Sequence, residues 1–230
     1  MKHLILGAVW VGMVAFTVRG GTIVGTVQAR AKLGTDNAAG GKYDSRKFKF
    51  AERVNYEALR DFVVYIEGPL GTNAVVPAKP TQVVTKRTVS QKGAVFSPHV
   101  LPVAVGTTVE WPNEDEIFHN VFSISEAKEF DFGLYKKPEM KRVTFTKPGR
   151  VDVFCSIHSS MNCVILVLEN SYFAIADGKG RYSISDVPPG TYQLKAWHER
   201  LPSQRQTITV SEMGEVRVDF TLGPGGAPKN

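Results

Sequence analysis

Short runs in which apolar and polar residues alternate recur along most of the chain, and this period of two predicts β-strands. Two early runs cover residues 22–29 and 61–67. From residue 82 onward, further runs follow at short intervals, separated by turn sequences such as Lys-Pro-Gly at 147–149. Many short strands at this spacing are typical of a β-sandwich or a β-barrel. We therefore predict an all-β fold.

Four stretches add detail to this pattern. Residues 163–168 (CVILVL) are apolar throughout, which predicts a strand buried on both faces. Residues 52–60 place their apolar residues at helical spacing and predict a short helix. Residues 30–47 are rich in Gly, Lys, Asn and Asp and are expected to form a long loop. Over residues 172–222, runs and turns alternate so closely that we predict a β-meander.

The first twenty residues have the pattern of an export signal. Lys2 belongs to a short polar start, and fifteen apolar or small residues follow at 4–18. This run is short for a membrane span, which needs about twenty residues. We expect residues 1–20 to be a signal peptide that directs the protein to a bacterial periplasm, with no membrane span after cleavage. Because Val-Arg-Gly at 18–20 is a poor cleavage site, an uncleaved membrane anchor stays open as an alternative.

The charge of the chain is mildly basic. The formal net charge is +6, and subtracting the two cations of the signal, Lys2 and Arg19, leaves +4. The basic residues are scattered through predicted loops and form no basic face, so nucleic-acid binding is disfavoured. Glu114, Asp115 and Glu116 form a short acidic run, which we expect to be a solvated turn, with a docking patch as the sharper alternative.

One segment, residues 151–163 (VDVFCSIHSSMNC), combines side chains that bind soft metal ions. Cys155, His158 and Met161 follow one another at intervals of three residues at the end of a predicted strand, and His119 lies in a separate strand-like run. One thiolate, two imidazoles and a weakly bound thioether are the ligands of a blue-copper electron-transfer site. We predict one type 1 copper ion, held by these four residues, that carries electrons.

The two cysteines, Cys155 and Cys163, also permit a simpler interpretation. In an oxidising compartment two cysteines ordinarily form a disulfide, and that bond would remove the thiolate ligand. A disulfide, however, requires neither His158 nor Met161. If copper binds, Cys163 is expected to be a small buried residue. Both alternatives stay open at this point.

Two further histidines, His99 and His198, lie beyond the signal, and we expect neither to bind metal. A copper enzyme such as a reductase or an oxidase needs additional copper centres with several more histidines. The sequence therefore favours an electron carrier over an enzyme.

The motifs HNV at 119–121 and CSIHSSM at 155–161 resemble those of the cupredoxins, the amicyanin/plastocyanin-like blue copper domains. The resemblance extends through GTTVEWPNEDEIFHNV and VTFTKPGRVDVFCSIH and covers about residues 82–169. It implies a Greek-key β-sandwich at residues 81–169. It also implies that Asn120 holds the ligand loops together by hydrogen bonds and that electrons pass through the exposed edge of His158.

The flanking segments resemble a different family. GTIVGTV at 21–27, FVVYIEG at 62–68 and DGKGRYSISDVPPGTYQLKAWHE at 177–199 are similar to the carboxypeptidase regulatory-like, or transthyretin-like, β-sandwich. The resemblance implies that the cupredoxin is inserted into this sandwich, whose two parts are residues 21–80 and 170–222. Residues 223–230 are expected to be a disordered tail. The whole arrangement looks like the methylamine-utilisation-type cupredoxin proteins.

Two functional hypotheses follow. The first is a periplasmic electron carrier, for which the resemblance implies a c-type cytochrome or a quinoprotein dehydrogenase as redox partner. The alternative is an envelope module that binds carbohydrate or protein and retains a vestigial, metal-free cupredoxin domain. The binding of copper distinguishes the two.

Overall fold

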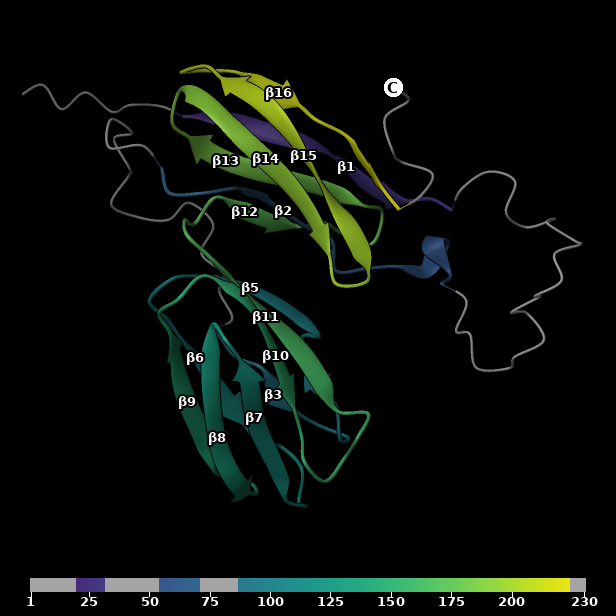
Figure 1. Cartoon of the computed structure of the whole chain (residues 1–230), viewed down its shortest axis with the longest axis vertical. Helices are drawn as coiled ribbons and strands as arrows, with labels where there is room; N and C mark the ends of the chain where they lie inside the picture. Colours follow the sequence, from purple (N-terminus) through teal and green to yellow (C-terminus); the bar gives the residue numbers. More distant parts are fainter. Residues whose placement is uncertain (1–19, 32–53, 71–86, 224–230) are drawn as a thin grey trace, which may run out of the picture.

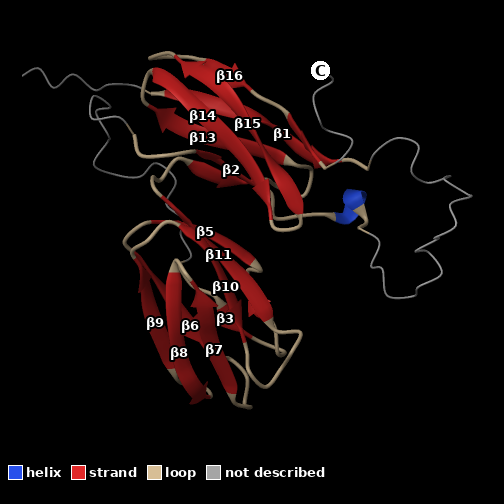
Figure 2. Ribbon diagram, viewed as in Figure 1, coloured by secondary structure: helices blue, strands red, loops and turns tan. Residues whose placement is uncertain are grey.

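The computed structural model describes residues 20–31, 54–70 and 87–223. Most of this part lies in strands and the turns between them, and its one helix is the short 3-10 helix η2 (Tyr56–Ala58). The strands form two bodies, drawn one above the other in Figures 1 and 2. The all-β prediction is confirmed. Three predicted segments fall wholly or mainly outside the described residues: the signal at 1–20, the loop at 30–47 and the tail at 223–230.

The lower body in Figure 1 contains the nine strands from β3 to β11. They are β3 (Ser90–Gln91), β4 (Phe96–Ser97), β5 (Val100–Ala104), β6 (Thr107–Pro112), β7 (His119–Ser125), β8 (Lys128–Tyr135), β9 (Met140–Phe145), β10 (Gly149–Phe154) and β11 (Asn162–Leu168). One sheet has the order β5-β11-β10-β7-β8, and β6 pairs with β9. Trp111 and Phe145 from the β6-β9 pair are fully buried against Val121, Val151 and Ile165 of the larger sheet. This apolar core stabilises the lower body.

The upper body combines strands from before and after the lower body. They are β1 (Gly21–Ala29), β2 (Val63–Ile66), β12 (Phe173–Ile175), β13 (Arg181–Val187), β14 (Gly190–His198), β15 (Leu201–Val210), β16 (Glu215–Arg217) and β17 (Phe220–Leu222). One sheet has the order β13-β1-β16, with β17 also paired to β1, and the other has the order β12-β2-β14-β15. Ile23, Val64, Ile184, Leu194 and Phe220 are buried between them.

The β-meander predicted for residues 172–222 is wrong. Only β14 and β15 form a hairpin, because β12 pairs with β2 and β13 pairs with β1. Sequence periodicity reports which face of a strand is buried, but it carries no information about which strand lies next to it. Dividing these strands between two sheets lets their apolar faces enclose one core.

The helix predicted at residues 52–60 is also wrong in its described part, where only the single turn η2 forms. Asn55 caps this turn by accepting hydrogen bonds from the amides of Glu57 and Ala58. The backbone is already extended at Leu59, and Asp61 has a positive φ of 61°. The chain must extend here to enter β2, and this tertiary requirement overrides a weak helical pattern.

Strand β11 is buried on both faces, as its continuous apolar sequence predicted. Cys163, Ile165 and Val167 point into the core of the lower body. Val164 and Leu166 point the other way and pack with residues of the upper body. This strand therefore belongs to two apolar clusters and joins the two bodies.

Candidate metal centre

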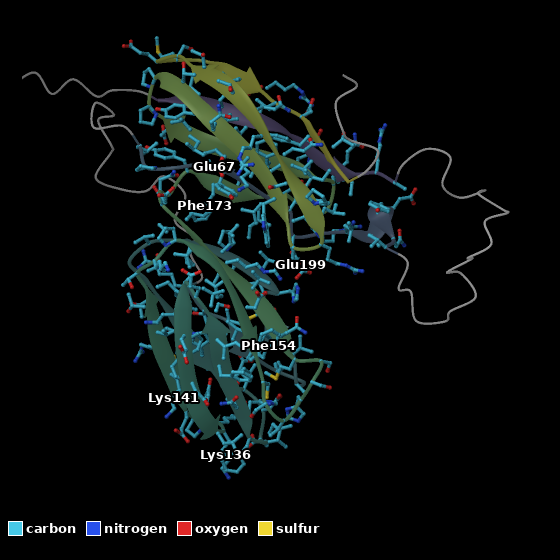
Figure 3. All side chains as sticks on the ribbon, in the orientation of Figure 1. Glu67, Lys136, Lys141, Phe154, Phe173 and Glu199 are labelled. Atoms are coloured by element: carbon cyan, nitrogen blue, oxygen red, sulfur yellow. The ribbon has the colours of Figure 1, made fainter. Side chains whose placement is uncertain are left out.

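The predicted ligands come from two neighbouring parts of the lower body. His119 is the first residue of β7 and pairs with Tyr135 at the end of β8. Lys136, the next residue, lies at the end of this body that is remote from the upper one (Figure 3). Cys155 follows the last residue of β10, and residues 155–161 form the loop that leads to β11. Because β10 pairs with β7 through Phe154 and Phe122, the loop begins beside β7.

Three of the four predicted ligands lie together. The ligand atoms of His119, Cys155 and His158 are all within 4.8 Å of one another. The Nδ1 atoms of the two histidines are 3.1 Å apart, and the Cys155 Sγ is 3.7 Å from the His158 Nδ1. A metal ion binds imidazole nitrogen at about 2.0 Å and thiolate sulfur at about 2.3 Å. Both of these separations are shorter than the corresponding pair of bond lengths combined, so the two histidine nitrogens, and likewise the Cys155 sulfur and the His158 nitrogen, lie close enough to share one ion.

Met161 closes the same loop. Its backbone N–H donates to the His158 carbonyl at 3.0 Å, and its carbonyl accepts from the Cys155 N–H at 3.1 Å. The side chain is 1% exposed and belongs to the same apolar cluster as Cys155. The backbone hydrogen bonds therefore hold Met161 next to Cys155 and His158, and its side chain is buried.

Asp115 orients His119, and the sequence did not identify this role. The Asp115 Oδ2 is 2.8 Å from the His119 Nε2. A carboxylate at neutral pH can only accept, so Nε2 carries the proton and Nδ1 keeps its lone pair toward His158. The acidic run was expected to be a solvated turn or a docking patch, but His119 is fully buried and Asp115 reaches it. The only sequence feature that could have indicated this contact is that Asp115 and His119 are four residues apart.

Backbone hydrogen bonds keep Asp115 ionised. The amide of Ala94 donates to Oδ2 at 3.0 Å, and the amide of Gly93 donates to Oδ1 at 2.8 Å. The Ala94 bond is the main cause that lowers the pKa of Asp115 to about 2, with the Gly93 bond and His119 contributing and burial opposing. A permanent negative charge therefore lies behind the His119 ring at neutral pH.

Asn120 connects the loop to β7 and β8. Its backbone N–H donates to the Cys155 Sγ at 3.5 Å, and its side-chain oxygen accepts from the Ser156 N–H at 3.3 Å. Its side-chain nitrogen donates to the Asp131 Oδ1 at 2.6 Å. The sulfur atom thus receives a hydrogen bond that stabilises a thiolate, and the residue that follows the cysteine is held in place.

The other candidate residues lie elsewhere. His99 contacts Glu199 and the Asn162 carbonyl between the two bodies. The His198 Nδ1 accepts from the Arg200 N–H, its ring packs on Phe62, and burial lowers its pKa. Neither histidine belongs to the group formed by His119, Cys155 and His158.

Both cysteines are free thiols in the structure. Cys163 lies on β11 opposite Val153, is 1% exposed, and has a pKa raised by burial and by the nearby Asp152 carboxylate. A neutral, buried thiol is a poor nucleophile, because the thiolate is the reactive form. In the structure Cys155 is therefore not bonded to Cys163, and its Sγ lies near the His158 Nδ1.

Thiol counting tests this arrangement. We expect metal-free protein that is unfolded without reductant to release two reactive thiols, one from each cysteine. The measurement is reaction with a chromogenic disulfide reagent, with a reduced sample as the control for complete reaction. A count near zero in the untreated sample would mean that Cys155 and Cys163 pair and that the thiolate is lost.

Comparison with known protein families assigns both bodies. Residues 83–168 match the copper binding proteins of the plastocyanin/azurin family. Residues 162–223 match the carboxypeptidase regulatory-like domain. The chain contains a cupredoxin domain and a carboxypeptidase regulatory-like domain. The two matches overlap at residues 162–168, which are β11, and this strand hydrogen-bonds to β10 and β5 of the cupredoxin domain.

Several solved structures are similar to part of the chain. A purple cupredoxin from Nitrosopumilus maritimus shares 27% identity over 35% of this chain and 97% of its own, with a TM-score of 0.31. A reduced amicyanin variant shares 24% identity over 38% of this chain and 86% of its own, with a TM-score of 0.34. A copper-containing nitrite reductase from Thermus scotoductus SA-01 shares 32% identity over 46% of this chain but only 28% of the enzyme, with a TM-score of 0.36.

The search of curated proteins found no match to this chain. Within residues 20–31, 54–70 and 87–223, no helix is long and apolar enough to cross a membrane.

Proposed function

We propose that this protein is a type 1 copper protein that carries single electrons between redox partners in the periplasm. One observation carries the proposal: a thiolate donor and two imidazole nitrogens lie within 4.8 Å of one another in a domain of a copper-binding family. This donor set suits copper because sulfur ligands stabilise Cu(I) and imidazoles support Cu(II). When bound, copper supplies a reversible one-electron change.

The residues of the chain would hold the ion with little rearrangement. His119, Cys155 and His158 would be the strong ligands, and Met161 the weak fourth ligand. Their positions are already restrained by the Asp115 contact, by the two backbone hydrogen bonds of the loop and by the Asn120 network. Ligands held in this way favour rapid electron transfer, because the same cage accommodates both oxidation states.

Partner access is proposed to occur at His158. This side chain is partly exposed, whereas His119, Cys155 and Met161 are buried. Three large apolar side chains next to ligand residues in the sequence are also exposed: Ile117, Phe118 and Ile157. An exposed apolar surface suits a transient protein contact. We propose a c-type cytochrome or a quinoprotein dehydrogenase as the partner.

An electron carrier is preferred over a copper enzyme. In the part of the chain that the structure describes, His119, Cys155 and His158 are the one group of three metal-binding side chains. A reductase or oxidase needs a second copper centre, and within residues 20–31, 54–70 and 87–223 we find no second group of this kind. The envelope-module alternative requires that the candidate site binds no metal. No observation on the described residues favours it.

Copper titration tests the proposed function. We expect one equivalent of Cu(II) to produce an intense visible sulfur-to-copper charge-transfer band and the EPR signal of a type 1 centre. Ascorbate should bleach the band, and a c-type cytochrome in its oxidised form should restore it. Zinc-loaded protein provides the colourless control. A copper-loaded protein without this band would contradict the proposal, and failure to bind copper would favour the envelope module.

A further inference from the structure

The two domains share a buried apolar contact. Val63, Tyr65 and Phe173 of the regulatory-like domain pack with four residues of the cupredoxin domain: Val100, Val164, Leu166 and Leu168. Trp197 on β14 packs against the same cluster. Figure 3 shows Phe173 on the side of the upper domain that faces the lower one. The β2-β12-β14 sheet therefore buries its outer face against β5 and β11.

A polar bridge crosses the edge of this contact. Glu199 lies in the turn between β14 and β15, and Figure 3 shows it where the upper domain meets the lower one. Both of its carboxylate oxygens are 3.0 Å from the His99 Nε2, and the His99 Nδ1 is 3.2 Å from the Asn162 carbonyl. The Glu199 carboxylate and the Asn162 carbonyl can only accept hydrogen bonds, so in each contact the donor is the His99 ring.

The bridge ends beside the metal loop. Asn162 directly follows Met161, and the His99 carbonyl accepts from the Val164 N–H at 2.8 Å. Arg150 fixes the Glu199 turn from the other side. Its Nη1 donates to the Glu199 carbonyl at 3.2 Å, and its guanidinium lies 6.0 Å from the centre of the Trp197 ring. The turn is therefore attached to the cupredoxin domain at two points, through His99 and through Arg150, and Trp197 on β14 adds a third contact.

We propose that the regulatory-like domain positions the copper loop through the Glu199–His99–Asn162 bridge. Glu199 is a positioning residue because it acts on the loop through His99 and does not touch the proposed ligands. The bridge anchors the exit of the loop at Asn162, while Asn120 anchors its entrance at Ser156. A loop anchored at both ends holds Met161 at a defined position. The effect on copper rests on the proposed function, whereas the effect on the loop does not.

Amide hydrogen exchange of the metal-free protein tests the effect on the loop. We expect Glu199→Ala and His99→Gln to accelerate exchange at the Met161 and Cys155 amides by roughly 2- to 30-fold, the range that changes in such networks produce. Glu199→Gln keeps a hydrogen-bond acceptor and should restore most of the protection. Glu212→Ala removes an exposed carboxylate of the same domain and serves as the matched control. Unchanged loop exchange in folded Glu199→Ala and His99→Gln would overturn the proposal.

Redox titration of the copper-loaded protein tests the effect on the site. We expect Glu199→Ala to change the ratio of oxidised to reduced protein at a fixed potential by at least about twofold, in the same direction as His99→Gln. The double variant should show no further change, because both substitutions break one bridge. An unchanged ratio with accelerated loop exchange would overturn the effect on copper. If the unaltered protein does not bind copper, the proposed function fails, and the exchange result still decides whether the bridge holds the loop.

Discussion

Copper-loaded protein in which Cys155 is replaced by serine is expected to be colourless and to bind copper more than about 100-fold more weakly. The intense visible band requires a thiolate on copper, and the Cys155 Sγ is the sulfur that lies next to the two histidines. We expect that Cys163 does not replace it, because this thiol is buried on β11 and does not belong to the group formed with the two histidines. The effect exceeds the 10- to 100-fold loss that is typical when only a supporting residue is removed.

The matched control is Cys163→Ala. This variant removes the other cysteine and leaves the proposed ligands in place, so its copper-loaded form should keep the visible band. The measurements are visible and EPR spectra at equal copper content and an affinity from competition with a chelator. If the Cys155→Ser protein retained the band, or the Cys163→Ala protein lost it, Cys155 would not be the thiolate ligand.

Replacing Asp115 with alanine is expected to weaken copper binding by about 10- to 100-fold. The carboxylate holds the proton of His119 on Nε2 and leaves Nδ1 free to bind metal, and without it both ring tautomers become accessible. Two backbone amides, of Gly93 and Ala94, also lose their acceptor, so the variant should be less stable by roughly 1–3 kcal/mol. Copper affinity by chelator competition measures the first effect, and thermal unfolding measures the second.

A measurement on metal-free protein separates the effect of Asp115 on the orientation of the His119 ring from its effect on the stability of the protein. In metal-free protein, ring nitrogen chemical shifts should report a single tautomer for His119, and Asp115→Ala should give a mixture. Glu116→Ala is the matched control, because its carboxylate is exposed and pairs with Lys137 at the surface. A folded Asp115→Ala protein with unchanged tautomer and unchanged copper affinity would show that the carboxylate does not orient the ligand.

The two types of domain were recognisable from local features. Strand periodicity predicted the all-β class, and the apolar sequence of residues 163–168 predicted a strand with two buried faces. Cys155, His158 and Met161 lie so close together in the sequence that one tight loop is enough to bring them together. Such features depend on neighbours in the sequence, so they can be read without a structure.

Strand partnership was not readable in this way. β13 pairs with β1 across more than a hundred residues of intervening chain, and nothing in either strand specifies the other. The β-meander prediction failed for this reason. The helix predicted at residues 52–60 failed because the chain must straighten to enter β2.

The sequence by itself predicted the chemistry of the candidate site: two histidines, a cysteine and a methionine in strands and a loop, a combination that suits copper. Only the tertiary structure decided what surrounds that chemistry. Asp115 contacts His119 and is held there by the amides of Gly93 and Ala94, and Glu199 contacts His99 from the other domain. Ligand identity is a local property of side chains, whereas their orientation depends on contacts that exist only after the chain has packed.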